Sequence, residues 1–266
     1  MTLLLFDLDG TLLTRERSIH PANLEVLTEL MERGVWVSLA TGRPPRSVKR
    51  YAEMLRPNAP LIHFNGAVVR DWQSGEVIEK QNLQREDALA ALSIGSELGI
   101  HANVYVGDEI FIEKWSAVSE ASEIKDGVPQ TVVGNLNKYL TDEKGDPIKI
   151  MFIGEPSVLP GLERALRGAL DSPCTLVNSE PNYLEMLPAG VTKATGARAL
   201  AAHLGITLDD AIAFGDNKND IELLEACGHG VAMANAVPAL VERANETIGD
   251  HDTAAIADFL RLSFPR

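Results

Sequence analysis

The sequence predicts an α/β protein: a core built on a parallel sheet, with a second α/β unit inserted into it. Short unbroken apolar runs alternate with amphipathic helical stretches near both ends of the chain, as expected for strands that are buried on both faces. The middle of the chain changes to helices and hairpins. With 266 residues, the chain is long enough for a core and a sizeable second unit.

Composition and charge limit the function classes. The formal net charge of −14 argues against a nucleic-acid partner, because basic patches supply most of the affinity for a phosphate backbone. Cys174 and Cys227 lie far apart and outside any CxxC spacing, so neither a disulfide framework nor a zinc cluster is indicated. No apolar stretch approaches the roughly 20 residues needed to span a bilayer. We therefore expect a cytoplasmic protein with no membrane partner.

The first strand is predicted at residues 3–6, a short apolar run that ends in Asp7-Leu8-Asp9-Gly10. After Pro21, apolar residues recur with helical spacing until Gly34, which predicts an amphipathic helix with a glycine stop. The acidic motif is therefore expected at the carboxyl end of a buried strand.

The second strand is predicted at residues 35–40 and runs into Thr41-Gly42-Arg43. Pro44-Pro45 then opens another predicted helix, which extends to about residue 55. Ligands of parallel sheets gather outside the carboxyl ends of the strands. Asp7, Asp9 and Thr41 are thus expected at one edge of the sheet.

The inserted unit is predicted from a change of pattern in the middle of the chain. Residues 61–64 predict a third core strand, and Asn65-Gly66 is a strong turn signal before a hairpin. From about residue 83 to residue 187 the pattern becomes helix, strand and hairpin. We therefore expect a discontinuous core of residues 1–82 and 188–266, and an inserted unit of residues 83–187.

The core pattern resumes after the insertion. A helix is predicted at residues 192–203, with Lys193 in its first turn, and a buried strand at residues 211–214. Gly215-Asp216-Asn217-Lys218-Asn219-Asp220 follows that strand directly. Asp216 is therefore expected at the same sheet edge as Asp7.

Asp7 and Asp9 can take two different roles in one reaction. Phosphoryl transfer needs an in-line nucleophile, a cation that neutralises the phosphoryl oxygens, and an acid for the leaving group. Asp7 could attack while Asp9 handles a proton. The alternative is that Asp and Gly at the end of a strand merely form a turn.

A phosphate site is predicted around Thr41 and Lys193. A hydroxyl and an exposed backbone N–H of Gly42 at a strand-helix junction can bind an anion. A lysine in the first turn of a helix opposes the helix dipole at a cost of about 0.3–1 kcal/mol, which favours a functional reason for Lys193. The alternatives are an ordinary Thr-Gly turn and a solvated lysine.

A magnesium site is predicted where the carboxylates converge. Magnesium prefers oxygen ligands and retained waters, with one or two protein carboxylates bound directly, and Asp7 and Asp216 fit that number. Asp220 could hold a metal-bound water or cap its helix.

Taken together, these motifs resemble the four ordered motifs of the haloacid dehalogenase superfamily. Two further stretches, Asn65-Gly66-Ala67 and residues 231–236, resemble its Cof-type hydrolases. The four motifs are Asp7-Leu-Asp9-Gly-Thr11, Thr41-Gly-Arg43, Lys193 and Gly215-Asp216-x-x-Asn219-Asp220.

The resemblance implies a Rossmann-like, three-layer α/β/α core and an Mg²⁺-dependent phosphatase that forms an aspartyl-phosphate on Asp7, with Asp9 as acid and then base. It implies Mg²⁺ ligands from Asp7, Asp216 and the Asp9 carbonyl. It implies a C2-type cap between the second and third motifs that covers a small phosphorylated metabolite, with a sugar phosphate as the first expectation and a cofactor phosphate as the second. The phosphate would be bound by Leu8, Thr41, Gly42, Arg43, Lys193 and Asn219.

One segment departs from the Cof-type pattern. Gly249-Asp250-His251-Asp252 stands where Cof-type sequences often carry an Asn-containing acidic turn. His251 could replace a contact made by that turn or could be a surface histidine, which is the expectation.

Other functions remain as alternatives. A phosphomutase of the phosphomannomutase type would share the first motif and the position of the cap, but its metal loop usually carries extra glycines. Dehalogenation does not require the leaving-group acid that Asp9 supplies. A non-catalytic sugar-phosphate-binding protein is the alternative outside the enzymes.

Overall fold

The computed structural model describes residues 2–142, 145–170 and 173–265. The chain divides into two compact units: unit 1 comprises residues 1–43, 48–80 and 192–266, and unit 2 comprises residues 44–47 and 81–191. Within the described residues, no helix has the length and apolar character needed to cross a membrane.

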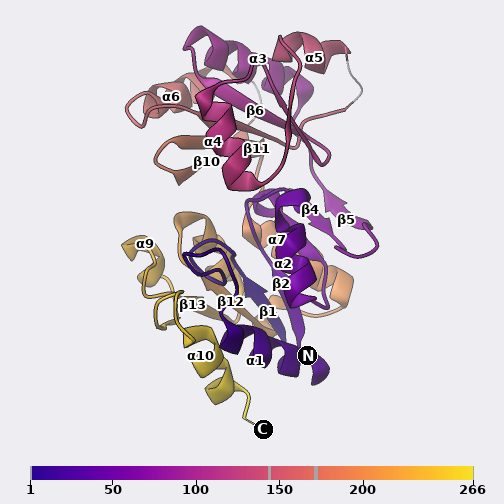
Figure 1. Ribbon diagram of the computed structural model, residues 1–266, viewed down its shortest axis with the longest axis vertical. Coiled ribbons are helices and arrows are strands. Elements are labelled where there is room, and N and C mark those ends of the chain that lie inside the picture. Colours follow the sequence, from indigo (N-terminus) through magenta and orange to yellow (C-terminus); the bar gives the residue numbers. More distant parts are fainter. Residues whose placement is uncertain (1, 143–144, 171–172, 266) are drawn as a thin grey trace. The chain divides into compact units, whose positions relative to one another are not determined.

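The elements of both units follow one another as shown in Figure 1. Unit 1 contains β1 (Leu3–Phe6), α1 (Pro21–Glu32), β2 (Trp36–Leu39), residues 48–55 of α2 (Pro45–Leu55), β3 (Leu61–His63), the 3-10 turn η1 (Phe64–Gly66), β4 (Val68–Arg70), β5 (Val77–Lys80), α7 (Lys193–Leu204), η2 (Leu208–Asp210), β12 (Ala211–Gly215), η3 (Lys218–Asp220), α8 (Ile221–Ala226), β13 (His229–Ala232), α9 (Pro238–Val241), β14 (Glu246–Thr247) and α10 (Ala255–Ser263). Unit 2 contains α3 (Arg85–Glu97), β6 (His101–Val106), β7 (Glu109–Ile112), α4 (Ala117–Asp126), β8 (Gln130–Val132), α5 (Leu136–Asp142), β9 (Lys149–Ile153), α6 (Leu159–Ala169), β10 (Cys174–Glu180) and β11 (Tyr183–Pro188).

The main sheet of unit 1 has the strand order β14-β13-β12-β1-β2, and every neighbouring pair is parallel. β1 lies between β12 and β2, with Leu3 in register with Ala211 on one side and Trp36 on the other. All four side chains of β1 are buried, as its unbroken apolar run predicts.

Helices cover both faces of this sheet, which confirms the three-layer core. Because side chains alternate along a strand, Leu4 and Phe6 pack on one face with α1, α2 and α10. Leu3 and Leu5 pack on the other face with α7, α8 and α9. The predicted catalytic motifs are therefore carried by loops at the edge of a sheet that is covered on both faces.

The third predicted strand differs from expectation. Residues 61–63 form β3, which pairs antiparallel with β4 in a separate sheet of order β3-β4-β5. A single parallel bridge between Ala40 and Ile62 connects β3 to the chain that follows β2. The left-handed backbone of Phe64 and Asn65 turns the chain back at once, so β3 pairs with the strand that follows it.

Unit 2 is built on a six-stranded sheet of order β10-β11-β9-β6-β7-β8, in which only the β7–β8 pair is parallel. One face packs against α3, α5 and α6 through residues such as Val104 and Phe152. On the other face, α4 contacts β6, where Asn103 donates a hydrogen bond to Ser122.

A buried ion pair joins two strands of this sheet. Lys149 of β9 lies 3.2 Å from Glu185 of β11, and the two side chains are 3% and 6% exposed. The Lys149 ammonium also lies 4.6 Å from the centre of the Tyr105 ring. Each charge depends on the other because water cannot solvate either of them.

We predict that Lys149→Met destabilises unit 2 by about 3–5 kcal/mol, because it removes the cation that faces buried Glu185. Urea unfolding followed by circular dichroism would measure this. The double replacement Lys149→Met with Glu185→Leu should recover most of the loss. Lys138→Met, which breaks an exposed ion pair with Asp142, is the matched control and should leave the unfolding midpoint unchanged. Equal effects of the two lysine variants would contradict the prediction.

Candidate active site

Three neighbouring strands bring the predicted catalytic motifs together. Asp7 follows β1, Asp216 follows β12 and Thr41 follows β2, and β1 is the middle one of these strands. The Asp7 N–H donates to the carbonyl of Phe214 at 3.0 Å, which extends the pairing of β1 and β12 up to the motif. The parallel register therefore sets the Asp7 and Asp216 carboxylates side by side.

Lys193 is the first residue of α7 and lies at the centre of the site. Thr192 caps this helix by accepting a hydrogen bond from the N–H of Thr195. The Lys193 ammonium lies 2.6 Å from Asp7 Oδ1 and 2.6 Å from Asp220 Oδ1, with 1% of the side chain exposed. Burial alone would lower the pKa of Lys193, but the charges of Asp220 and Asp7 outweigh it and hold that pKa above its ordinary value. Lys193 is therefore a permanent cation.

Asp220 is fully buried and organises the loop that follows β12. Its Oδ1 accepts from Lys193, and its Oδ2 accepts from the backbone N–H groups of Asp216 and Asn217 at 3.1 and 3.0 Å. A Cβ on Gly215 would lie only 2.5 Å from the Asp220 Cβ, so this position needs glycine. Asp220 therefore fixes the position of the loop after β12 and of the Lys193 ammonium.

The carboxylates of Asp7 and Asp216 share an electrostatically unfavourable site. Burial raises the pKa of Asp7 well above its ordinary value; Lys193 opposes this, and the nearby carboxylates add to it. Burial, together with the charge of Asp220, raises the pKa of Asp216 to about 6. Thr11 donates a hydrogen bond to Asp216 Oδ1 at 3.1 Å. A bound cation would relieve this accumulation of negative charge.

The oxygen atoms at this site fit a magnesium ion. Carboxylate oxygens of Asp7, Asp216 and Asp220 lie within 4.8 Å of one another. Both oxygens of Asp220 already accept hydrogen bonds, so Asp7 and Asp216 are the two carboxylates that fit direct binding. One or two protein carboxylates are the usual number for Mg²⁺.

Arg43 and Asp9 form a bidentate ion pair. Arg43 Nε lies 2.6 Å from Asp9 Oδ2, and a terminal guanidinium nitrogen lies 2.7 Å from Asp9 Oδ1. The Arg43 side chain is 7% exposed, whereas that of Asp9 is 53% exposed. In this structure, the guanidinium that the sequence assigned to phosphate binding fixes the direction of the Asp9 carboxylate.

The other predicted phosphate contacts surround the same edge. Thr41 is buried, and its hydroxyl accepts a hydrogen bond from the Arg43 N–H at 3.2 Å. The Asn219 carboxamide donates to Asn65 Oδ1 at 3.0 Å. The Leu8 side chain is fully buried, so Leu8 could contact a phosphate only through its backbone.

Sequence reasoning missed a pair of residues that hold the loop after Asp9. The Asn235 carboxamide donates to the carbonyl of Gly10 at 2.8 Å and accepts from the His251 N–H at 3.2 Å. His251 is buried, and its Nδ1 lies 2.6 Å from the carbonyl of Leu13, so Nδ1 carries the proton. The expectation of a surface histidine was wrong. The sequence signal that could have indicated this pair was Asn235, because it lies in residues 231–236, the stretch that resembles Cof-type hydrolases.

The acidic residues beside His251 are also engaged. Arg15 pairs with Asp250 at 3.4 Å and with Asp252 at 2.5 Å, and the Arg15 N–H donates to Asp252 Oδ1. Segment 249–252 therefore fastens the loop that begins at Asp9.

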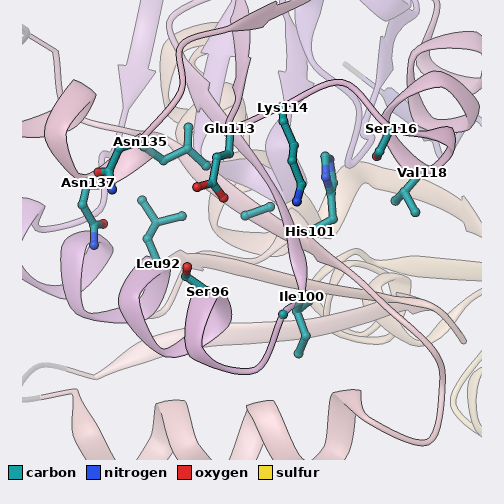
Figure 2. Close-up of a pocket in the computed structure, with 13 residues that line it drawn as sticks. Leu92, Ser96, Ile100, His101, Glu113, Lys114, Ser116, Val118, Asn135 and Asn137 are labelled. Atoms are coloured by element: carbon teal, nitrogen blue, oxygen red, sulfur yellow. The ribbon is translucent and has the colours of Figure 1, made fainter.

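Unit 2 contains a hollow of about 440 Å³ that none of the predicted site residues lines. Its floor is apolar, with Leu92 and Leu136 buried, whereas Glu113 and Lys114 on its rim are exposed. Figure 2 shows His101 next to Lys114 at this hollow. Burial lowers the pKa of His101. The hollow has no paired carboxylates and does not reproduce the chemistry of the cluster in unit 1.

Comparison with known proteins agrees with this geometry. The chain is 32% identical over 261 residues to an HMP-PP phosphatase of Enterobacter sp. (strain 638), covering 96% of this chain and 93% of that protein. It is 26% identical to a 5-amino-6-(5-phospho-D-ribitylamino)uracil phosphatase of Bacillus subtilis, covering 98% of this chain and 97% of that protein.

The fold has close counterparts among solved structures. A haloacid dehalogenase-like hydrolase from Bacteroides thetaiotaomicron superposes with a TM-score of 0.90 at 26% identity, covering 99% of each chain. The family model for haloacid dehalogenase-like hydrolases matches residues 4–260, which is nearly the whole chain. The protein therefore belongs to the haloacid dehalogenase-like hydrolases of the Cof type, the family that its motifs resemble.

Proposed function

We propose that this phosphatase hydrolyses the phosphate ester of a small metabolite, with Mg²⁺, through an aspartyl-phosphate at Asp7. The observation that carries the proposal is the buried Lys193, whose ammonium joins Asp7 to Asp220 while Asp216 lies beside them. A nucleophilic carboxylate, a fixed cation and oxygen ligands for a metal thus meet at one edge of the sheet.

The proposed reaction has two steps. An oxygen of Asp7 forms a bond to phosphorus while the ester P–O bond breaks. For this step Asp9 carries a proton on one oxygen while the other accepts from Arg43, and it gives that proton to the leaving oxygen. Asp9 then takes a proton from water, whose oxygen attacks phosphorus, and phosphate leaves as the Asp7 carboxylate is restored. Lys193 would hold Asp7 Oδ1 in place while the other oxygen of Asp7 reacts. Mg²⁺ held by Asp7, Asp216 and the Asp9 carbonyl would neutralise charge on the phosphoryl oxygens.

Unit 2 is proposed to act as the cap that selects the substrate. A sugar phosphate is the first candidate from the sequence. A cofactor phosphate is the second candidate. The name of one relative, which acts on a uracil that carries a phosphorylated ribityl chain, supports a small phosphorylated metabolite without choosing between the two. We propose the cytoplasm as the compartment and a small phosphorylated molecule as the partner.

We predict Mg²⁺-dependent phosphate release from at least one member of a panel of phosphorylated sugars, nucleotides and cofactor precursors. EDTA should abolish it, and Asp7→Asn should lower kcat by about 10⁴-fold or more. The variant should still fold, because it removes one of several crowded negative charges. Asp142→Asn, at an exposed acid of unit 2, is the control. An Asp7→Asn enzyme with full activity would exclude Asp7 as nucleophile.

A second prediction concerns pH. The pKa of Asp216 is about 6 in the folded protein against an ordinary 3.8, so the folded state binds this proton more tightly than the unfolded chain does. Protonation of Asp216 therefore stabilises the metal-free folded protein. This stabilisation is complete below pH 3.8, the ordinary pKa, and is lost as the pH rises through about 6. Protons therefore compete with Mg²⁺ at low pH.

We accordingly expect a fixed Mg²⁺ concentration to raise the melting temperature more at about pH 7.5 than at about pH 5. Thermal unfolding with and without the metal would measure the difference. Asp216→Asn should abolish the metal-dependent rise at both values. The same rise at both values for the wild-type protein would show that these carboxylates do not bind the metal.

The ion pair of Arg43 with Asp9 gives a further prediction. Arg43→Gln removes the guanidinium that orients the Asp9 carboxylate, so kcat should fall while inhibition by inorganic phosphate changes little. Steady-state kinetics with phosphate as inhibitor would separate the two effects. A large loss of phosphate inhibition at unchanged kcat would instead support the phosphate contact that the sequence predicts for Arg43.

A further inference from the structure

Two adjacent residues near the site, Phe64 and Asn65, have left-handed backbone conformations. Their φ angles are 50° and 54°, in a region that residues other than glycine rarely adopt, although asparagine does so more often than most. Both residues are buried. Such a conformation costs of order 1–3 kcal/mol per residue and persists where the surroundings impose it, often at functional sites.

Backbone hydrogen bonds connect the turn at Phe64 and Asn65 to residues 41–43, the loop after β2 that carries predicted phosphate contacts. The Asn65 N–H donates to the carbonyl of Thr41 at 3.0 Å, and the Phe64 N–H donates to the carbonyl of Arg43 at 3.3 Å. The turn therefore fixes the backbone on both sides of Gly42.

The Asn65 side chain lies between two predicted phosphate-binding elements. Its Oδ1 accepts a hydrogen bond from the Asn219 carboxamide nitrogen at 3.0 Å. A Cβ on Gly42 would lie 3.2 Å from both the nitrogen and the oxygen of the Asn65 carboxamide, so the loop after β2 lies directly against it. Asn65 thus joins the loop that carries Thr41 to the loop that carries Asn219.

The residue after Asn65 approaches the helix that carries Lys193. A Cβ on Gly66 would lie 2.0 Å from the carbonyl oxygen of Thr192, and a Cβ on Gly196 would lie 2.9 Å from Gly66 Cα. No side chain fits between the turn and the start of α7. The turn therefore contacts three of the four segments that carry predicted phosphate contacts: the loop after β2, the loop after β12 and the start of α7.

We propose that Asn65 is a positioning residue that orients the Asn219 carboxamide toward the phosphate, an inference that rests on the proposed function. Accepting one N–H of Asn219 fixes the plane of that carboxamide and gives its second N–H a set direction. Glycine would adopt the same φ at lower cost if the turn alone mattered. Asparagine adopts this φ more often than most residues, so the hydrogen bond to Asn219 and the contact with Gly42 carry the proposal rather than the strain.

The test compares Asn65→Gly, Asn219→Ala and the double variant. The dissociation constant of inorganic phosphate in the presence of Mg²⁺ is measured by calorimetry, and stability by urea unfolding. Asn65→Gly should unfold at the same or higher urea concentration than the wild type, because glycine relieves the strain. It should nevertheless bind phosphate about tenfold more weakly, which is the loss of one oriented hydrogen bond to an anion.

The double variant shows whether Asn65 acts through Asn219. Its phosphate affinity should match that of Asn219→Ala, because both changes remove the same interaction. Arg56→Gly is the matched control: Arg56 has a φ of 52° and is exposed at the end of α2, so glycine should relieve strain there without changing phosphate affinity.

Two outcomes would overturn the proposal. Asn65→Gly could bind phosphate as tightly as the wild type, or the two single effects could add in the double variant. The proposed function is tested separately, since it fails if the wild type releases phosphate from no ester, whereas the Asn65 test needs only phosphate binding.

Discussion

The buried ammonium of Lys193 is the interaction on which the rest of the site depends. Taking a charge out of water costs several kcal/mol, and the carboxylates of Asp7 and Asp220 offset this cost at 2.6 Å each. The same contacts hold Asp7 at the end of β1 and Asp220 under the loop that follows β12. One cation therefore connects the predicted nucleophile, the predicted metal-binding loop after β12 and the start of α7.

Further residues fix the loops around this centre. Asn235 and His251 hold the backbone after Asp9, and Asn65 lies against Gly42 and Asn219. The contacts of Asn235 and His251 join segments from the two ends of the chain. Oriented groups that need no rearrangement during the reaction are what phosphoryl transfer requires of a protein. The charged centre and its supporting loops thus form one preorganised unit.

Much of the core was predictable because its signals are local. The unbroken apolar run of residues 3–6 predicts a buried strand, and the run is buried between two parallel neighbours. Residues 61–64 were harder: their apolar character indicates a strand but cannot say which strand pairs with it. The left-handed turn at Phe64 and Asn65 decided that pairing. His251 was assigned to the surface because nothing in its local sequence shows that Leu13 covers it.

The sequence by itself determined which chemical groups are present and at which strand ends they stand, because hydrophobic periodicity and motif order are properties of neighbouring residues. Only the tertiary structure decided that Arg43 holds Asp9, that Asp220 uses both oxygens within the protein, and that Asn65 supports Asn219. Each of these contacts except that of Asp220 with its own loop joins residues far apart along the chain. Their distances are set by the packing of helices against the sheet, which no local pattern records.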